Sequence, residues 1–129
     1  MKKHINTSIF IIVGLINFAP ITGVLGAERL IVGYGLTTLN QDLTLLLQHR
    51  AVLFGIIGGY LLFSAFRPSH RPVATVMGFA SMVSFLLLFG FSDSRNENLS
   101  LIMTIDLIAI GLLLIAAVME CRLQTKTQS

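Results

Sequence analysis

Four long runs of apolar residues dominate the chain, and only three short polar connections separate them. The runs cover about residues 5–27, 43–66, 73–91 and 99–119. Each is close to the roughly 20 residues that an α-helix needs to cross about 30 Å of hydrocarbon. The pattern therefore predicts an all-α fold, an integral membrane four-helix bundle. A short helix at the membrane interface is expected over about residues 28–34.

Composition supports the membrane class and excludes several others. Hydrophobic residues make up 54% of the 129 residues and charged residues only 12%, whereas a soluble domain carries about 25% charged residues. We expect one transmembrane domain over residues 1–129, with no separate catalytic domain. The net charge of +3 comes without a basic stripe or aromatic platform, so no nucleic-acid partner is expected. Cys121 is the only cysteine, which excludes an intramolecular disulfide and a cysteine-based zinc site.

The basic residues predict the topology, because lysine and arginine concentrate on the cytoplasmic flanks of membrane helices. An arrangement with both termini inside gives six cytoplasmic basic residues against two outside, Arg29 and Arg95. The six are Lys2, Lys3, Arg67, Arg71, Arg122 and Lys126. The alternative is that Lys2-Lys3 and the first run form a secretory signal peptide. That run reaches about 22 residues and lacks a clean cleavage site, so we expect the first helix to be retained.

Two local signals mark helix ends. Asn17 and Pro20 lie in the first run, and a proline inside a helix predicts a kink or an early end there. Residues 38–41 have the spacing of a capping box, which predicts a start for the second long helix.

The most costly polar groups lie inside the second and fourth runs. Arg50, preceded by His49, and Asp106 lie at similar depths in the outer half of the predicted bilayer. An arginine at the membrane centre costs about 2.5–3.5 kcal/mol, so it normally faces a partner or a wet cavity. We predict an ion pair between Arg50 and Asp106. Glu28 and Arg29 are further candidates for the same polar site, at its outer opening. The pair is either a packing device, part of a polar pocket with His49 for an anionic or quinone-like ligand, or part of a proton relay.

Small residues in the second run predict close helix packing. Ala51, Gly55 and Gly59 recur every fourth residue, which lets another backbone approach where lipid supplies no hydrophobic drive. The partner is either another helix of this chain or a second copy of it. The three histidines have no ligand spacing and fall on both sides of the membrane, so no metal is expected.

Two segments carry a resemblance to a known group of proteins. At Glu28-Arg29-Leu30 with Tyr34-Gly35, and again over residues 49–55, the chain resembles small bacterial four-helix inner-membrane proteins, which are distantly similar to DoxX-type proteins. The resemblance implies a multi-pass protein of the bacterial inner (cytoplasmic) membrane. It assigns no biochemical role and therefore no catalytic residue.

Some chains of this kind carry the name phosphopantetheine adenylyltransferase, an activity that these residues do not support. That enzyme family is a soluble α/β nucleotidyltransferase with an H-x-G-H motif, and this sequence contains no such motif. We therefore expect no enzyme activity and no cofactor. The first expectation is an accessory or interaction protein of the bilayer, acting as a homo-oligomer or with a membrane-protein partner. The alternatives are a small-ligand-binding protein with an outward-facing pocket at His49, Arg50 and Asp106 and, third, an oligomeric transporter.

Overall fold

The computed structural model describes residues 1–128, which are almost entirely helical and contain no strand. The prediction of an all-α fold is confirmed. The elements are α1 (Lys2–Phe18), a 3-10 segment η1 (Ala19–Leu25), α2 (Ala27–Tyr34), α3 (Gln41–Phe66), a 3-10 turn η2 (Pro68–His70), α4 (Arg71–Gly90) and α5 (Glu97–Gln128).

Four helical stretches are long and apolar enough to cross a membrane: Lys2–Leu25, Gln41–Phe66, Pro68–Gly90 and Glu97–Gln128. They coincide with the four apolar runs of the sequence. The last helix is longer than its apolar run, since α5 continues to Gln128 rather than ending near residue 119. Its 32 residues extend about 48 Å at 1.5 Å per residue. Its final turns therefore reach well past the other helices at that end.

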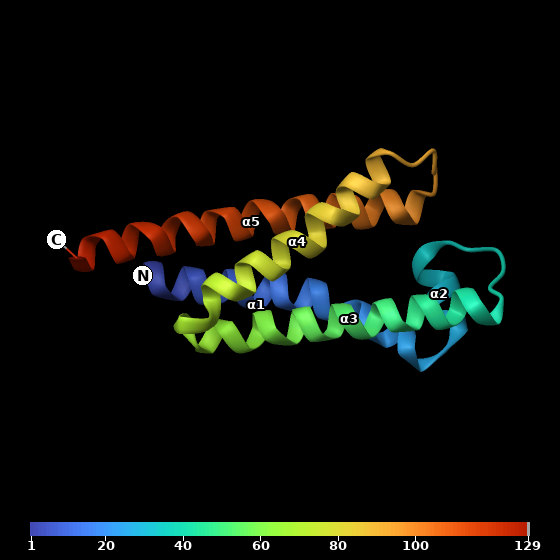
Figure 1. Ribbon diagram of the computed structural model, residues 1–129, viewed down its shortest axis with the longest axis horizontal. Helices are drawn as coiled ribbons and strands as arrows, with labels where there is room; N and C mark the ends of the chain where they lie inside the picture. The colour runs from blue at the N-terminus through green and yellow to red at the C-terminus, as the bar shows by residue number, and fades with distance from the viewer. Residues whose placement is uncertain (129) are drawn as a thin grey trace.

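The long helices lie lengthwise beside one another, with both termini at the same end (Figure 1). We call this the termini end, and the opposite end, where α2 lies, the α2 end. Around the bundle the order of contacts is α1, α3, α4, α5 and back to α1. The helix α4 leaves α3 at the turn η2 and runs obliquely to meet the start of α5 (Figure 1).

Local sequence signals explain where the helices end. Because proline lacks a backbone N–H donor, α1 ends at Phe18 and the chain continues through η1, in which Pro20 is the second residue. The helix α2 ends at Gly35, whose φ of 62° is a left-handed conformation that glycine adopts without strain. The capping box expected at residues 38–41 is wrong. The N-cap of α3 is Asn40, whose Oδ1 accepts from the backbone N–H of Leu43 at 2.7 Å.

The close approach of α1 and α3 depends on small residues, but Gly59 is not one of them. A Cβ added at Gly55 would lie 2.4 Å from the side chain of Ile21, and one at Gly58 would lie 2.4 Å from the backbone of Phe18. A Cβ at Gly59 would meet nothing within 4 Å. Ala51, Gly55 and Gly58 follow the helical spacing i, i+4, i+7 and so share one face, whereas Gly59 is turned about 100° from Gly58.

The well-packed core lies at the centre of the bundle and toward the termini end. Its buried side chains come from all four long helices: Ile9, Phe10, Val13, Leu61, Ala65, Ala74, Met82, Ala109, Leu113 and Ala116. Large side chains such as Phe10 and Leu61 are fully buried among alanines of α4 and α5. The two cavities that Arg50 lines lie toward the α2 end of this core, and further hollows lie beside Arg71 at the termini end.

Candidate functional site

Arg50 lies among three aromatic rings toward the α2 end of the bundle. Its guanidinium carbon is 5.0 Å from the ring centre of Phe54, 5.1 Å from that of Phe85 and 5.5 Å from that of Tyr34. These rings come from α3, α4 and α2 respectively. A guanidinium at such distances is attracted by the negative face of the ring. The rings hold the arginine in place but do not neutralise its charge.

Tyr34 is held near Arg50 by the connection that precedes α5. The side-chain amide of Asn96 donates to the carbonyl oxygen of Tyr34 at 2.7 Å, and that of Asn98 donates to the carbonyl oxygen of Val32 at 2.9 Å. These carbonyls lie at the end of α2, where a helix leaves acceptors without partners. The two asparagines therefore tie α2 to the start of α5 and fix the α2 side of the site.

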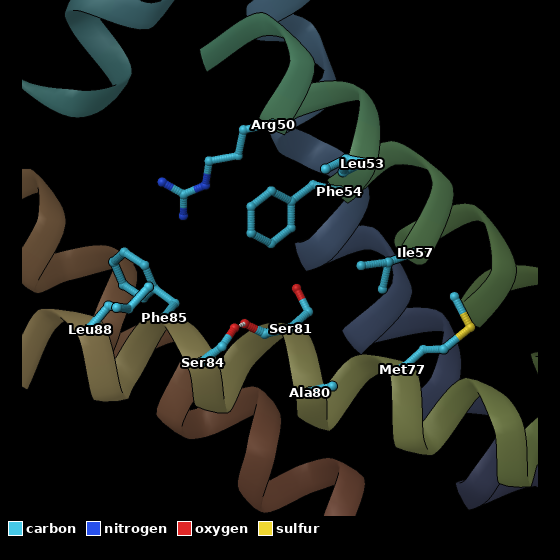
Figure 2. Close-up of a pocket in the computed structure, with 10 residues that line it drawn as sticks. All are labelled: Arg50, Leu53, Phe54, Ile57, Met77, Ala80, Ser81, Ser84, Phe85 and Leu88. Carbon is cyan, nitrogen blue, oxygen red and sulfur yellow. Dashed lines mark hydrogen bonds between the residues drawn. The ribbon is translucent and has the colours of Figure 1, made fainter. Parts of the chain in front are cut away.

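An apolar cleft of about 560 Å³ lies between α3 and α4. Figure 2 shows the guanidinium of Arg50 reaching from α3 into this space, with Phe85 on the opposite helix. The α3–α4 cleft is open to the side of the bundle, since Leu53 and Leu88 on its walls are exposed. Its lining residues are Arg50, Leu53, Phe54, Ile57, Met77, Ala80, Ser81, Ser84, Phe85 and Leu88.

A second cavity, which we call the chamber, has a volume of about 190 Å³ and lies further inside the bundle. Arg50 and Phe54 line both spaces, so these two side chains form the wall that the cleft and the chamber share. The residues that line the chamber are Ile16, Asn17, Ala19, Pro20, Tyr34, Arg50, Phe54, Ile102, Ile105 and Asp106. Most of this lining is apolar, but it includes four side chains that can form hydrogen bonds.

Arg50 and Asp106 are brought to the same cavity, but they do not form the expected ion pair. Among residues 1–128, no carboxylate lies within 4.0 Å of the Arg50 guanidinium. The physical reason is the direction of the side chains rather than their depth. Arg50 is turned toward rings on α2, α3 and α4, while Asp106 lines the chamber from α5 and is 7% exposed. Its carboxylate accepts no hydrogen bond from the described part of the chain.

The other residues predicted for the site lie outside it. His49 is exposed and lines neither the cleft nor the chamber, because the position next to Arg50 is turned about 100° around α3. Glu28 is also exposed and lines neither space. Arg29 is exposed and borders a separate hollow of about 140 Å³ near η1.

Asn17 belongs to the chamber, although the sequence suggested only a helix end near it. Its amide nitrogen donates to the carbonyl oxygen of Val13 at 3.0 Å and lies 3.8 Å from the sulfur of Met82. Its Oδ1 is buried and has no partner in the described structure. A buried acceptor without a partner costs about 1–3 kcal/mol. Such a group on the wall of a cavity favours an occupant that can donate a hydrogen bond.

A second polar cluster, at the termini end, was not predicted. Arg71 is buried and pairs with Glu120, which also accepts from the amide of Asn6 at 2.8 Å. The remaining guanidinium donors bind the hydroxyl of Thr7 and backbone carbonyl oxygens at the end of α3. Arg71 was expected only as one of the cytoplasmic basic residues, whereas in the structure it begins α4, is buried and joins all four long helices. Glu120 balances the charge of Arg71, and the four hydrogen bonds of Arg71 reach three other helices, so this cluster is a structural clamp. Asn6 Oδ1 is buried there without a partner in the described structure.

Comparison with known proteins adds no assignment to this geometry. No family model, no curated protein and no solved structure matches the chain. The resemblance to small four-helix inner-membrane proteins therefore stays a prediction, and the functional argument depends on the site alone.

Proposed function

We propose that this chain is a multi-pass membrane protein that binds an anionic amphiphile in the α3–α4 cleft. The anionic group lies against Arg50, and the apolar part of the ligand lies along Leu53, Ile57 and Met77. One observation carries the proposal: a guanidinium at the head of an apolar cleft faces three rings and no carboxylate within 4.0 Å.

The charge of Arg50 supports an anionic ligand. A guanidinium inside a membrane helix needs an anion or water, and its planar fork of donors matches a carboxylate or a phosphate. Cation–π contacts are worth about 2 kcal/mol when desolvated, which does not offset the removal of a charge from water. Arg50 therefore retains donors for a ligand. Arg71, by contrast, has its carboxylate already and is not a binding group.

The form of the cleft supports an amphiphile rather than a small soluble anion. Its volume of about 560 Å³ falls within the about 300–1,000 Å³ of small-molecule sites. Its walls are apolar apart from Arg50 and two serines, and it opens to the side of the bundle. In a bilayer that side faces lipid, so a ligand with an acyl or similar chain can enter without crossing water.

Ligand binding is preferred over an interaction role because the small residues of α3 are already used. Ala51, Gly55 and Gly58 are covered by α1 and η1, which leaves no stripe of small residues there for a second copy. A transporter would need the chamber or the cleft to open toward both ends. The packed core at the centre of the bundle argues against such a path within one chain.

Fluorescence titration with a dansyl-labelled fatty acid and its uncharged methyl ester tests the proposal on protein purified in a neutral detergent. We expect the acid to bind more tightly than the ester. We also expect Arg50→Gln to weaken binding of the acid about 10- to 100-fold, because the loss of a hydrogen bond to a charged group costs about 1.5–3 kcal/mol. The affinity for the methyl ester should be unaffected by this substitution. Arg67→Gln, at an exposed arginine of the turn, is the matched control.

A second pair of variants tests the cleft itself. Ala80→Trp places a large ring between α3 and α4 and should abolish binding of both probes, since Ala80 lines the cleft. Val76→Trp, at an exposed position of α4 outside the lining, should leave binding unchanged. Equal affinities for acid and ester, or full binding by the Arg50→Gln and Ala80→Trp variants, would contradict the proposal.

A further inference from the structure

We infer that the chamber is a second subsite, which takes a hydroxyl-bearing head group attached to the anionic group at Arg50. This inference rests on the proposed function. It identifies the ligand class as a phospholipid of the surrounding bilayer whose phosphate carries a polyol, as in phosphatidylglycerol. The phosphate lies at Arg50, one acyl chain lies in the α3–α4 cleft, and the polyol lies in the chamber.

The shared wall makes one ligand in both spaces possible. Arg50 and Phe54 line the cleft on one side and the chamber on the other, so a group bound by the guanidinium stands at the entrance to both. The chamber volume of about 190 Å³ corresponds to several water molecules at about 30 Å³ each. That space admits a group of glycerol size and excludes a second acyl chain.

Two hydrogen-bond acceptors on the wall of the chamber have no donor in the described structure. Asn17 Oδ1 is buried without a partner, and its own amide nitrogen is already occupied by the carbonyl oxygen of Val13. The Asp106 carboxylate, on the helix opposite, also accepts no hydrogen bond from residues 1–128. Two acceptors thus face one cavity from α1 and α5. Hydroxyl groups satisfy both, whereas a purely apolar occupant leaves both without partners.

A neutral polyol supplies hydrogen-bond donors to the chamber without adding a charge to it. Arg50 and Asp106 contribute opposite charges to the same chamber, which is therefore close to neutral before a ligand enters. A phosphate at Arg50 with an uncharged polyol beyond it adds hydrogen bonds to Asp106 and Asn17. An ammonium arm also donates hydrogen bonds and is attracted by Asp106, so stronger displacement of the probe by phosphatidylethanolamine than by phosphatidylglycerol would contradict the polyol.

Competition between lipids with the same acyl chains tests this subsite. Phosphatidylglycerol and phosphatidylpropanol are both singly charged phosphodiesters that differ in the two head-group hydroxyls, so their displacement of the dansyl-labelled fatty acid isolates the contribution of the hydroxyls. We expect phosphatidylglycerol to displace the probe at about tenfold lower concentration, which corresponds to two modest hydrogen bonds. Asn17→Leu should bring the two lipids to within about twofold without weakening the binding of phosphatidylpropanol, because Asn17 does not line the cleft.

If Asn17→Leu fails to fold, a variant that fills the chamber with a larger side chain tests the same subsite. Ile105→Phe fills the chamber from α5 and should remove the preference for phosphatidylglycerol, while Ile108→Phe, exposed on the same helix and outside the lining, should preserve it. Equal displacement by the two lipids in the wild type, or failure of both to displace the probe, would overturn the subsite. If binding of the probe still depends on Arg50, the proposed function stands; if it does not, both fail.

Discussion

At the scale of residues, the clamp of Arg71 and Glu120 makes the sharpest stability prediction. Removing one partner of a fully buried pair costs about 3–5 kcal/mol because the other charge stays buried. The side chain of Glu120 is 23% exposed, so we expect Glu120→Ala to cost less, about 2 kcal/mol. The loss should appear as a lower midpoint of unfolding in detergent, followed by circular dichroism.

The apolar replacement of both partners separates the pair from the packing around it. Arg71→Met combined with Glu120→Leu removes both charges and should recover most of the stability lost by Glu120→Ala. Arg67→Ala, at an exposed position of the neighbouring turn, serves as the control and should leave the midpoint unchanged. A double variant less stable than Glu120→Ala would show that the hydrogen bonds it also removes, to Asn6, Thr7 and the end of α3, help to hold the helices together.

Charge in an apolar run can be found from sequence, whereas direction around a helix and uncharged amides cannot. Arg50 and Asp106 stood out because each is costly in a membrane, and their similar depth does bring them to one chamber. Depth does not fix which way a side chain points, so the ion pair was predicted but is absent from the described residues. Asn17 was not predicted to line a cavity. A single amide a few residues before a proline is an ordinary feature of a helix end, so nothing in the sequence pointed to a cavity there.

At the scale of elements, the contact of α1 with α3 predicts opposite outcomes at two neighbouring glycines. A Cβ at Gly58 would meet the backbone of Phe18 at 2.4 Å, and backbone cannot rotate away as a side chain does. We expect Gly58→Ala to destabilise the protein by about 1–3 kcal/mol, as for overpacking in a core. Gly59→Ala meets nothing within 4 Å and should be neutral or slightly stabilising.

The two glycine variants also distinguish packing inside the chain from a seam between copies. Their unfolding midpoints and their sizes on gel filtration should be measured together. If Gly59→Ala instead disrupts an oligomer while Gly58→Ala is tolerated, the exposed face of α3 is an interface and the assignment of the close contact to α1 is wrong.

The small-residue pattern in α3 shows how far sequence can describe an element. The spacing of Ala51 and Gly55 identified a face that packs closely, and that face is buried against α1 and η1. The prediction that Gly59 belongs to this face was wrong. The helix α1 packs on positions i, i+4 and i+7 of this face, and the third of these is Gly58. Gly58 and Gly59 are the same residue type at adjacent positions, so only the path of the neighbouring helix shows which of them lies at the contact.

At the scale of the whole molecule, the buried core lies at the centre and toward the termini end, and the two cavities that share Arg50 lie nearer α2. The core residues and the clamp hold the helices together at the centre and the termini end. The cleft and the chamber lie nearer α2, where α4 has moved away from α3 to meet α5 (Figure 1). None of the ten core residues lines the cleft or the chamber, so the proposed ligand site is separate from the packed core.

Under the proposed function, the topology of the chain decides which membrane leaflet would supply the ligand, and this topology is directly testable. Residues at the termini end include Lys2, Lys3 and Arg122, so we expect this end to be cytoplasmic and the α2 end to face outward. In a Cys121→Ser background, a membrane-impermeant maleimide should label Thr38→Cys in intact cells. It should label Gln128→Cys only after the cells are opened. The reverse pattern would invert the bundle and move the site to the cytoplasmic leaflet; labelling of both cysteines from outside would contradict a single inserted orientation.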